Sequence, residues 1–216
     1  MTRRPFLSLV GVAAVTAFAV FIVLVGFSQR HHAPPRGDDA VDRFLAAWRH
    51  SRTGTYVVDT TFTRRALNGS EINYFGRTAQ RPPERLVLAT DGSATLLRPG
   101  EVVTCTASPG SKHLQCLSSP TTESYNENVD AELADLEPYV RGTQPLYSVE
   151  IDEGGCFVLG RLRFAPTSPY GESATFCFDK KTGAPLSIRV NQGGVVDTTR
   201  AHDLRTTVTD RDLQPI

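Results

Sequence analysis

The chain has 216 residues, which suffices for one domain with a short appendage. It carries 23 basic and 23 acidic side chains, so its formal net charge is zero. A neutral chain lacks the concentrated positive charge that nucleic-acid binding requires, and we expect no nucleic-acid partner.

An uncharged segment runs from Pro5 to Phe27, directly after two arginines. As a helix it would span about 34 Å, at about 1.5 Å per residue, which exceeds the bilayer hydrocarbon thickness of about 30 Å. It is longer than the apolar run of a cleavable signal peptide, no small-x-small cleavage site follows it, and the first cysteine, Cys105, is too distant for a lipoprotein signal. The sequence therefore predicts an uncleaved membrane anchor within residues 1–29 and a polar linker over 30–37.

An amphipathic helix follows the linker, in DDAVDRFLAAWRHSR. Its apolar side chains recur at helical spacing: Val41, Phe44, Leu45 and Trp48. Asp38 or Asp39 can cap its start, and Gly54 can end it. We expect the apolar stripe to face the core of the domain.

From Tyr56 onward apolar and polar residues alternate, which is the spacing of a β-strand. The dipeptide Asn68–Gly69 is typical of a hairpin turn. Short strands separated by turns then repeat as far as residue 118, and five more are expected between residues 146 and 204. The spacing is that of a meander of antiparallel strands.

A second amphipathic helix, in NENVDAELADLEPYV, interrupts the strands. Asn126 or Asn128 can cap its start, and Pro138 is expected to kink or end it. Helices segregated from an antiparallel sheet define an α+β domain, expected over 38–210 with a tail at 211–216. The predicted order is thus a single N-terminal transmembrane helix and then a sheet of about ten or eleven strands packed on a few helices.

The four cysteines have gaps of ten and twenty residues, too wide for the C-x2-C spacing of zinc ligands or of a thioredoxin-like redox pair. If a four-residue loop joins the first two, Cys105 faces Cys116 across a hairpin, with Cβ atoms about 4.5–5.5 Å apart, near what a disulfide needs. Cys156 and Cys177 face each other in the same way in a longer hairpin. Of the three connectivities we prefer this one; the alternative is four free thiols in a cytoplasmic domain.

Disulfides persist outside the cytoplasm, so this pairing also orients the chain. The charges on the two sides of the apolar run are too similar to do so. We expect a single-pass protein of the cell membrane, with its N-terminus in the cytoplasm and its domain outside.

No motif for catalysis or cofactor binding occurs, since G-x-S-x-G, H-E-x-x-H, a Walker loop and G-x-G-x-x-G are all absent. The five histidines have no neighbouring acid–nucleophile pattern, and the acidic stretch DAELADLE is typical of a solvated helix face. We expect no catalytic residue, no cofactor and no metal, and therefore a protein that is not an enzyme.

The second cysteine hairpin is apolar on both faces, whereas an antiparallel sheet with one wet face should be apolar on one side only. Along its first strand Val158, Leu162 and Phe164 are expected to point to one side. The other side carries the candidate lining of an apolar cavity: Phe157, Leu159, Phe176 and Phe178. Either helices cover the second face, or the sheet curls around a cavity.

Three stretches of the chain resemble the LolA-like group of extracytoplasmic lipoprotein carriers and their RseB/MucB-type sensor relatives. They are FLAAWRHSRTGTYVVDTTFTRR, GRTAQRPPERLVLATDGSATLL and FCFDKKTGAPLSIRV, and together they are spread over most of the range from Asp38 to Leu204. The resemblance implies a curved, half-closed antiparallel sheet wrapped over helices. The apolar space between them would hold acyl chains or serve as a sensing surface.

The chain departs from that group in its membrane anchor and its two disulfides, and no ligand residue can be carried over. We expect an anchored domain that binds a lipid or lipidated ligand, such as a lipoprotein, in an apolar cavity without catalysis. The alternative is an envelope regulatory or scaffold protein that contacts another membrane protein and holds no small ligand. A filled core would favour the scaffold, and an open apolar pocket of about 300 Å³ or more would favour the carrier.

Overall fold

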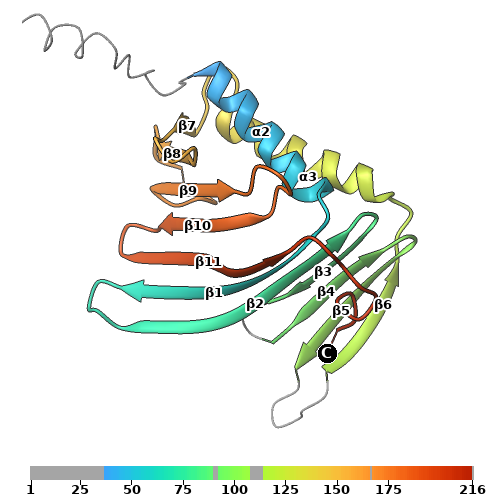
Figure 1. The fold of residues 1–216 in the computed structure, drawn as a ribbon. Coiled ribbons are helices and arrows are strands. Elements are labelled where there is room, and N and C mark those ends of the chain that lie inside the picture. Colours follow the sequence, from blue (N-terminus) through green and yellow to red (C-terminus); the bar gives the residue numbers. More distant parts are fainter. Residues whose placement is uncertain (1–36, 90–91, 108–113, 166, 216) are drawn as a thin grey trace, which may run out of the picture. The chain divides into compact units, whose positions relative to one another are not determined.

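The structure is a computed structural model that describes residues 37–215 except 90–91, 108–113 and 166. The predicted anchor, Pro5–Phe27, lies outside the described residues. Among those that are described, no helix is both long and apolar enough to cross a membrane. They form two helices and one eleven-stranded antiparallel sheet (Figure 1), which confirms the α+β class.

The elements follow one another with short connections. In chain order they are α2 (Asp38–Thr53), β1 (Tyr56–Ala66), β2 (Glu71–Arg81), β3 (Glu84–Leu88), β4 (Ala94–Arg98), β5 (Glu101–Ala107), β6 (Leu114–Pro120), α3 (Tyr125–Val140), β7 (Tyr147–Ile151), β8 (Phe157–Arg161), β9 (Ser173–Phe178), β10 (Pro185–Asn191) and β11 (Val195–Arg205). The sheet order is β6-β5-β4-β3-β2-β1-β11-β10-β9-β8-β7. Every pair of neighbours in the sheet is therefore also consecutive in the chain, except β1 and β11.

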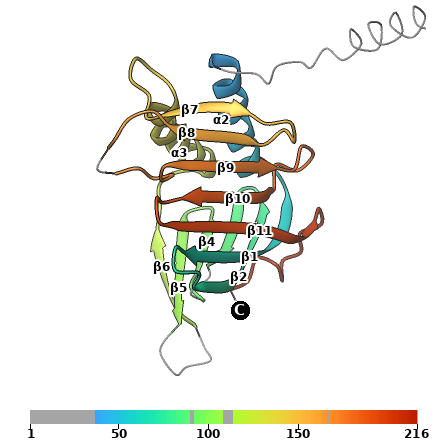
Figure 2. The same ribbon diagram turned by 90° about the vertical axis from the view of Figure 1, so that its left-hand side faces the viewer.

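The sheet is curved and unclosed, with β6 and β7 at its two edges. Strands β7 to β11, β1 and β2 stack as one ladder in front of the helices in Figure 2. Helix α3 connects the two edge strands, and α2 and α3 lie together on one side of the sheet (Figure 1). We call that side the helix-side face and the other the opposite face.

The hairpin turns follow the sequence signals. The predicted turn at Asn68–Gly69 joins β1 to β2, and Gly69 has a φ of 81°, which favours glycine. Cys105 pairs with Cys116 in the register expected for a four-residue loop, and the two are joined by a disulfide. The second disulfide joins Cys156 to Cys177. The connectivity is thus the one that the sequence favoured.

The second cysteine hairpin is shorter than expected. Strand β8 ends at Arg161, so the prediction of one continuous strand through Phe164 was wrong. The amide of Leu162 donates to the carbonyl of Leu146, just before β7, and this bond continues the β7–β8 ladder by one residue. Leu162 and Phe164 are exposed in the connection that follows.

The capping predictions were wrong for both helix starts. Helix α2 begins at Asp38, its N-cap is Gly37, and no side chain caps it, although the acidic first turn suits the helix dipole. Helix α3 begins one residue before Asn126, because Ser124 and Glu127 form a reciprocal capping box. Pro138 lies inside its last turn and does not end it.

Gly54 ends α2 as predicted, for a reason that the sequence does not contain. A Cβ atom at this position would lie 1.8 Å from the carbonyl oxygen of Thr182, in the turn between β9 and β10. Only glycine permits this close approach of two backbone segments.

The core is built on both faces of the sheet. On the helix-side face, a cluster joins α2 and α3 to β7, β8 and β9. On the opposite face, a second cluster lies over β1 to β5 and includes Cys105 and Leu213. Leu213, in the segment 211–216 expected as a tail, is only 2% exposed and packs among these residues.

We expect Gly54→Ala to destabilise the domain by more than about 2 kcal/mol, since two backbone segments must separate. Gly69→Ala is the matched control, because a Cβ there meets no atom within 4 Å and only the φ of 81° is unfavourable. Its cost should be about 1 kcal/mol. Chemical denaturation of the two variants measures the difference, and equal costs would contradict the close approach.

We also expect Asp212 to make a pH-dependent contribution to the stability of the domain. Its carboxylate accepts hydrogen bonds from the hydroxyl and amide of Thr209 and from Arg205. These bonds, the Thr209 hydroxyl first, hold the pKa of Asp212 well below its ordinary value of 3.8. The stabilisation is therefore complete above that value and is lost as the pH falls towards the folded pKa. Asp212→Asn should lower the free energy of unfolding by about 1–2 kcal/mol at pH 7 and by less in acid, as measured by chemical denaturation. Asp210→Asn should change it little at any pH.

Candidate functional site

The four residues expected to line a cavity instead belong to a filled aromatic core. Phe157 and Phe176 lie 5.4 and 5.6 Å, ring centre to ring centre, from Phe44 of α2. Trp48, one turn later on α2, contacts Phe176 and Phe178 edge-on. Leu159 is fully buried in the same cluster.

Helix α2 therefore covers this part of the helix-side face. The five hollows of about 170 to 530 Å³ considered among the described residues have none of these four side chains in their lining. Of the two explanations for an apolar second face, covering by a helix is the one that the structure shows for this hairpin.

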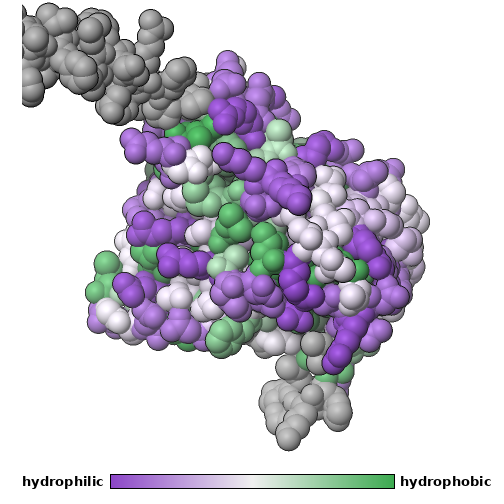
Figure 3. Space-filling view, in the orientation of Figure 1, coloured by the Kyte–Doolittle hydropathy of each residue, from purple (hydrophilic) through white to green (hydrophobic). Residues whose placement is uncertain are grey.

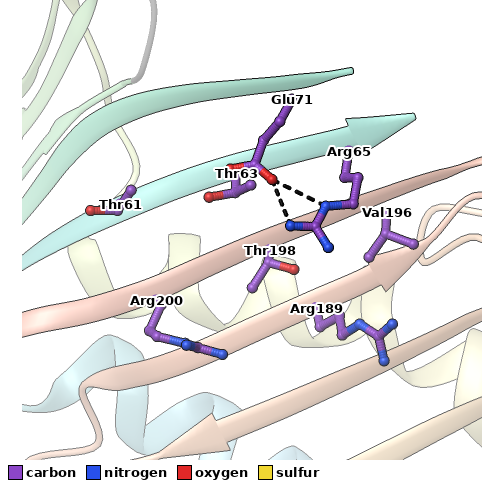
Figure 4. Close-up of a pocket in the computed structure, with 8 residues that line it drawn as sticks. All are labelled: Thr61, Thr63, Arg65, Glu71, Arg189, Val196, Thr198 and Arg200. Carbon is purple, nitrogen blue, oxygen red and sulfur yellow. Dashed lines mark hydrogen bonds and ion pairs between the residues drawn. The ribbon is translucent and has the colours of Figure 1, made fainter. Parts of the chain in front are cut away.

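A broad hollow of about 470 Å³ lies on the opposite face (Figure 4). Its floor is polar, with threonines from β1 and β11, and Arg65 forms an ion pair with Glu71 at its edge. Arg189 and Arg200 also line it, and both are exposed to solvent. This hollow lacks the apolar lining that an acyl chain requires.

Three apolar side chains of the helix-side face lie beyond the helices, beside the ion pair of Arg64 and Asp197. Phe62 on β1 pairs with Tyr74 on β2, and their rings lie 6.2 Å apart. Ile72 follows on the same face, and Ile72 and Tyr74 are 48% and 40% exposed. We call Phe62, Ile72 and Tyr74 the inner apolar patch.

The inner apolar patch is distinct from its surroundings. It lies near the turn of the β1–β2 hairpin, away from both helices in Figure 1. Most of the side chains visible in Figure 3 are hydrophilic, and the hydrophobic ones form small groups between them. On the same two strands the opposite face carries Thr61, Thr63 and Asn73, so the patch is more apolar than the face that water should favour.

A smaller hollow, of about 170 Å³, lies on the helix-side face between the start of α3 and strands β3 and β4. Its lining comes from both helices and from strands β3 and β4: Arg52, Arg85, Leu97, Tyr125, Asn128, Val129 and Glu132. It combines two arginines, one carboxylate and apolar side chains in a small volume. We call it the Arg85 hollow.

The polar groups around the Arg85 hollow are tightly bonded, with one exception. Arg52 donates two hydrogen bonds to Glu132, of 2.6 and 3.1 Å, and stacks 4.9 Å above the centre of the Trp48 ring. Tyr125 donates to the backbone carbonyl of Arg52, and burial raises the pKa of Tyr125 to about 12. The exception is Arg85 together with its neighbour Gln80: the Nε of Arg85 and the Oε1 of Gln80 are buried and have no hydrogen-bond partner among the described residues.

Gln80 lies beside Arg85 and ties the sheet to α2. Its side-chain amide donates to the carbonyls of Ser51 and Gly54 at the end of the helix. Tyr56 of β1, which pairs with Gln80 across the two strands, also donates to the carbonyl of Ser51. These bonds place the end of α2 next to the Arg85 hollow.

Sequence reasoning missed both features of the helix-side face. Phe62 and Tyr74 were recognised as strand residues, but nothing in their spacing shows that no helix covers them. Arg85 stands in the stretch RPPERLVLA, where an arginine is ordinarily a solvated side chain. Its strand parity relative to Leu86, which is buried on the opposite face, is the one signal that places it inward.

Neither metal ligands nor a match to a known family identifies the site. Among the described residues no group of three or more histidine, cysteine, aspartate or glutamate side chains could hold a metal ion. No protein-family model and no curated protein matches the chain.

Solved structures give distant likenesses. A LolA superfamily protein from Nitrosomonas europaea has 10% sequence identity and a TM-score of 0.34, over 81% of this chain and 97% of that one. An outer-membrane lipoprotein-sorting domain from Vibrio parahaemolyticus has 12% identity and a TM-score of 0.33, over 81% and 97%. The lipoprotein LppX from Mycobacterium tuberculosis has 10% identity and a TM-score of 0.31, over 80% and 99%.

The resemblance to the LolA-like group that the sequence suggested is thus also found among solved structures. Likenesses at this level of identity and TM-score identify no ligand and no partner of this chain.

Proposed function

We propose that the chain is a membrane-anchored, extracytoplasmic domain that binds a lipid or lipidated ligand on the helix-side face of its sheet, without catalysis. The observation that carries this proposal is the inner apolar patch. Ile72 and Tyr74 expose apolar surface beside the partly buried Phe62, near the turn of the β1–β2 hairpin, and the guanidinium of Arg64 lies over the Phe62 ring. Burying apolar surface contributes about 25 cal/mol per Å², so an acyl chain laid on this face is stabilised by contact alone.

The proposal differs from the expectation of a cavity lined by Phe157 and its neighbours. Phe44 and Trp48 already fill that space. The ligand would therefore lie farther out on the same face, over β1 and β2.

The scaffold function has its own supporting observation. The aromatic core under α2 is filled, and two hollows of about 470 and 530 Å³ are lined mainly by polar and charged residues. Edge strand β6 is exposed along most of its length, with Leu117 77% exposed, and such an edge can pair with a strand of another protein.

Tyr74 and its neighbour Phe75 offer a matched test of the lipid proposal. They lie on opposite faces of β2, and both are exposed, at 40% and 76%. Tyr74→Asp should weaken uptake of a fluorescent fatty acid by the delipidated full chain about tenfold or more, since an apolar contact worth about 1.5–3 kcal/mol is lost. Phe75→Asp should leave uptake unchanged.

Both side chains are surface residues, so neither change should alter the melting temperature appreciably. If the unchanged protein takes up no acyl probe, or if Phe75→Asp weakens uptake as much as Tyr74→Asp, the lipid proposal fails. Co-purification of a stoichiometric membrane protein with a lipid-free chain would then support the scaffold.

The proposed compartment has a separate test. Non-reducing peptide mapping of the protein from its native membrane should find Cys105 linked to Cys116 and Cys156 linked to Cys177. The intact mass should rise by about four protons on reduction, because each disulfide replaces two thiol hydrogens. Four free thiols in the native protein would contradict an extracytoplasmic domain.

A further inference from the structure

Arg85 is a partly buried cation without an ion-pair partner among the described residues. It lies on the helix-side face of β3, where it pairs with Gln80 of β2 and Leu97 of β4. Its Nε is buried without a hydrogen-bond partner, and no described residue forms an ion pair or a hydrogen bond with its guanidinium.

The charge of Glu132 favours charged Arg85, but the two side chains form no ion pair. Glu132 is engaged by both of its oxygens with Arg52. Burial lowers the pKa of Arg85, and the charge of Arg52 lowers it further. A guanidinium still keeps its charge at neutral pH, so the protein holds an uncompensated positive charge at the wall of a hollow.

Such an arrangement is unfavourable unless something else supplies the counter-charge. Buried charges in proteins are ordinarily paired, because a cation removed from water loses its solvation. An anion with oxygen acceptors would supply both the charge and the missing hydrogen bonds. The planar fork of a guanidinium matches a carboxylate or a phosphate in two bonds.

The size of the Arg85 hollow limits what can enter. At about 170 Å³ it is smaller than the 300–1,000 Å³ of ordinary ligand pockets, so it suits a head group and not a whole ligand. Leu97, Val129 and Tyr125 surround the remaining space. A small acidic group attached to an apolar body fits this lining better than a hydrated ion does.

The inner apolar patch lies on the same face. Gln80, which pairs with Arg85, and Tyr74, which belongs to the patch, are six residues apart on β2, about 20 Å along the strand. Thr78 and Gly76, the residues between them that share this face, are small. A long acyl chain can reach from one to the other.

We propose that the Arg85 hollow binds the carboxylate or phosphate head of an acidic lipid, whose acyl chain extends towards the inner apolar patch. This inference rests on the proposed function for the acyl chain, and on Arg85 alone for the acidic head. It assigns to the domain a preference for acidic over neutral amphiphiles.

The test compares palmitic acid with palmityl alcohol, which has the same chain and no charge. The delipidated full chain is held in an amphipathic polymer, and calorimetric titration measures both dissociation constants, with the empty polymer as blank. The acid should bind at least about tenfold more tightly than the alcohol. Arg85→Met should remove that difference by weakening only the acid.

Arg189→Met is the matched control. Arg189 is an exposed arginine of the polar hollow on the opposite face, and its loss should change neither dissociation constant. Equal affinities for acid and alcohol in the unchanged protein would overturn the inference and leave the lipid proposal standing. If neither amphiphile binds, the proposed function fails together with the head-group assignment.

A second titration measures the binding of inorganic phosphate and of acetate to the same protein. If either binds as tightly as palmitic acid and depends on Arg85, the site takes a free anion and the head-group assignment is wrong. Much weaker binding of both supports a lipid head group.

The melting temperature of the ligand-free Arg85→Met variant separates binding from folding. Because the change removes this partly buried charge and keeps most of the apolar stem, the melting temperature should stay the same or rise. A marked fall would show that Arg85 has a structural partner, and it would overturn the proposal.

Discussion

The pairing of β1 with β11 is the constraint on which the rest of the structure depends. Every other strand pair joins consecutive strands, so the two halves β1–β6 and β7–β11 would be separate meanders without it. Residues near 60 and near 200 must meet. Bringing such distant segments together has a high entropic cost, which arises before their contacts can stabilise the sheet. These two strands are among the longest in the sheet, and their ladder extends from Val57 to Ala66.

Joining the halves in this way also positions the helices. Helix α2 leads directly into β1, and α3 connects the two edge strands β6 and β7. Phe44 and Trp48 of α2 therefore meet Phe157 and Phe176 from the far half of the chain. The same geometry leaves the turn end of β1 and β2 uncovered, which is why apolar side chains remain exposed there.

The helix-side face thus contains three environments. A closed aromatic core lies under α2 on β7 to β9, a small hollow lined by Arg85 lies beside the start of α3 on β3 and β4, and a partly exposed apolar patch lies on β1 and β2 near their turn. A ligand with an acidic end and an apolar body would match the last two. The opposite face is polar in its hollow and is covered over β1 to β5 by the segment that ends at Leu213.

The sequence by itself determined the local structure: the class of the fold, the strand meander, the turn at Asn68–Gly69, the end of α2 at Gly54 and both cysteine pairings. These follow from residue spacing and turn chemistry, which act over a few residues. Only the tertiary structure decided that β1 meets β11, that α2 fills the space beside Phe157, and that Arg85 faces a hollow while Glu132 is taken by Arg52. Each of these depends on which side chains from distant parts of the chain compete for the same partner or the same volume. The spacing of residues along the chain does not predict the outcome of that competition.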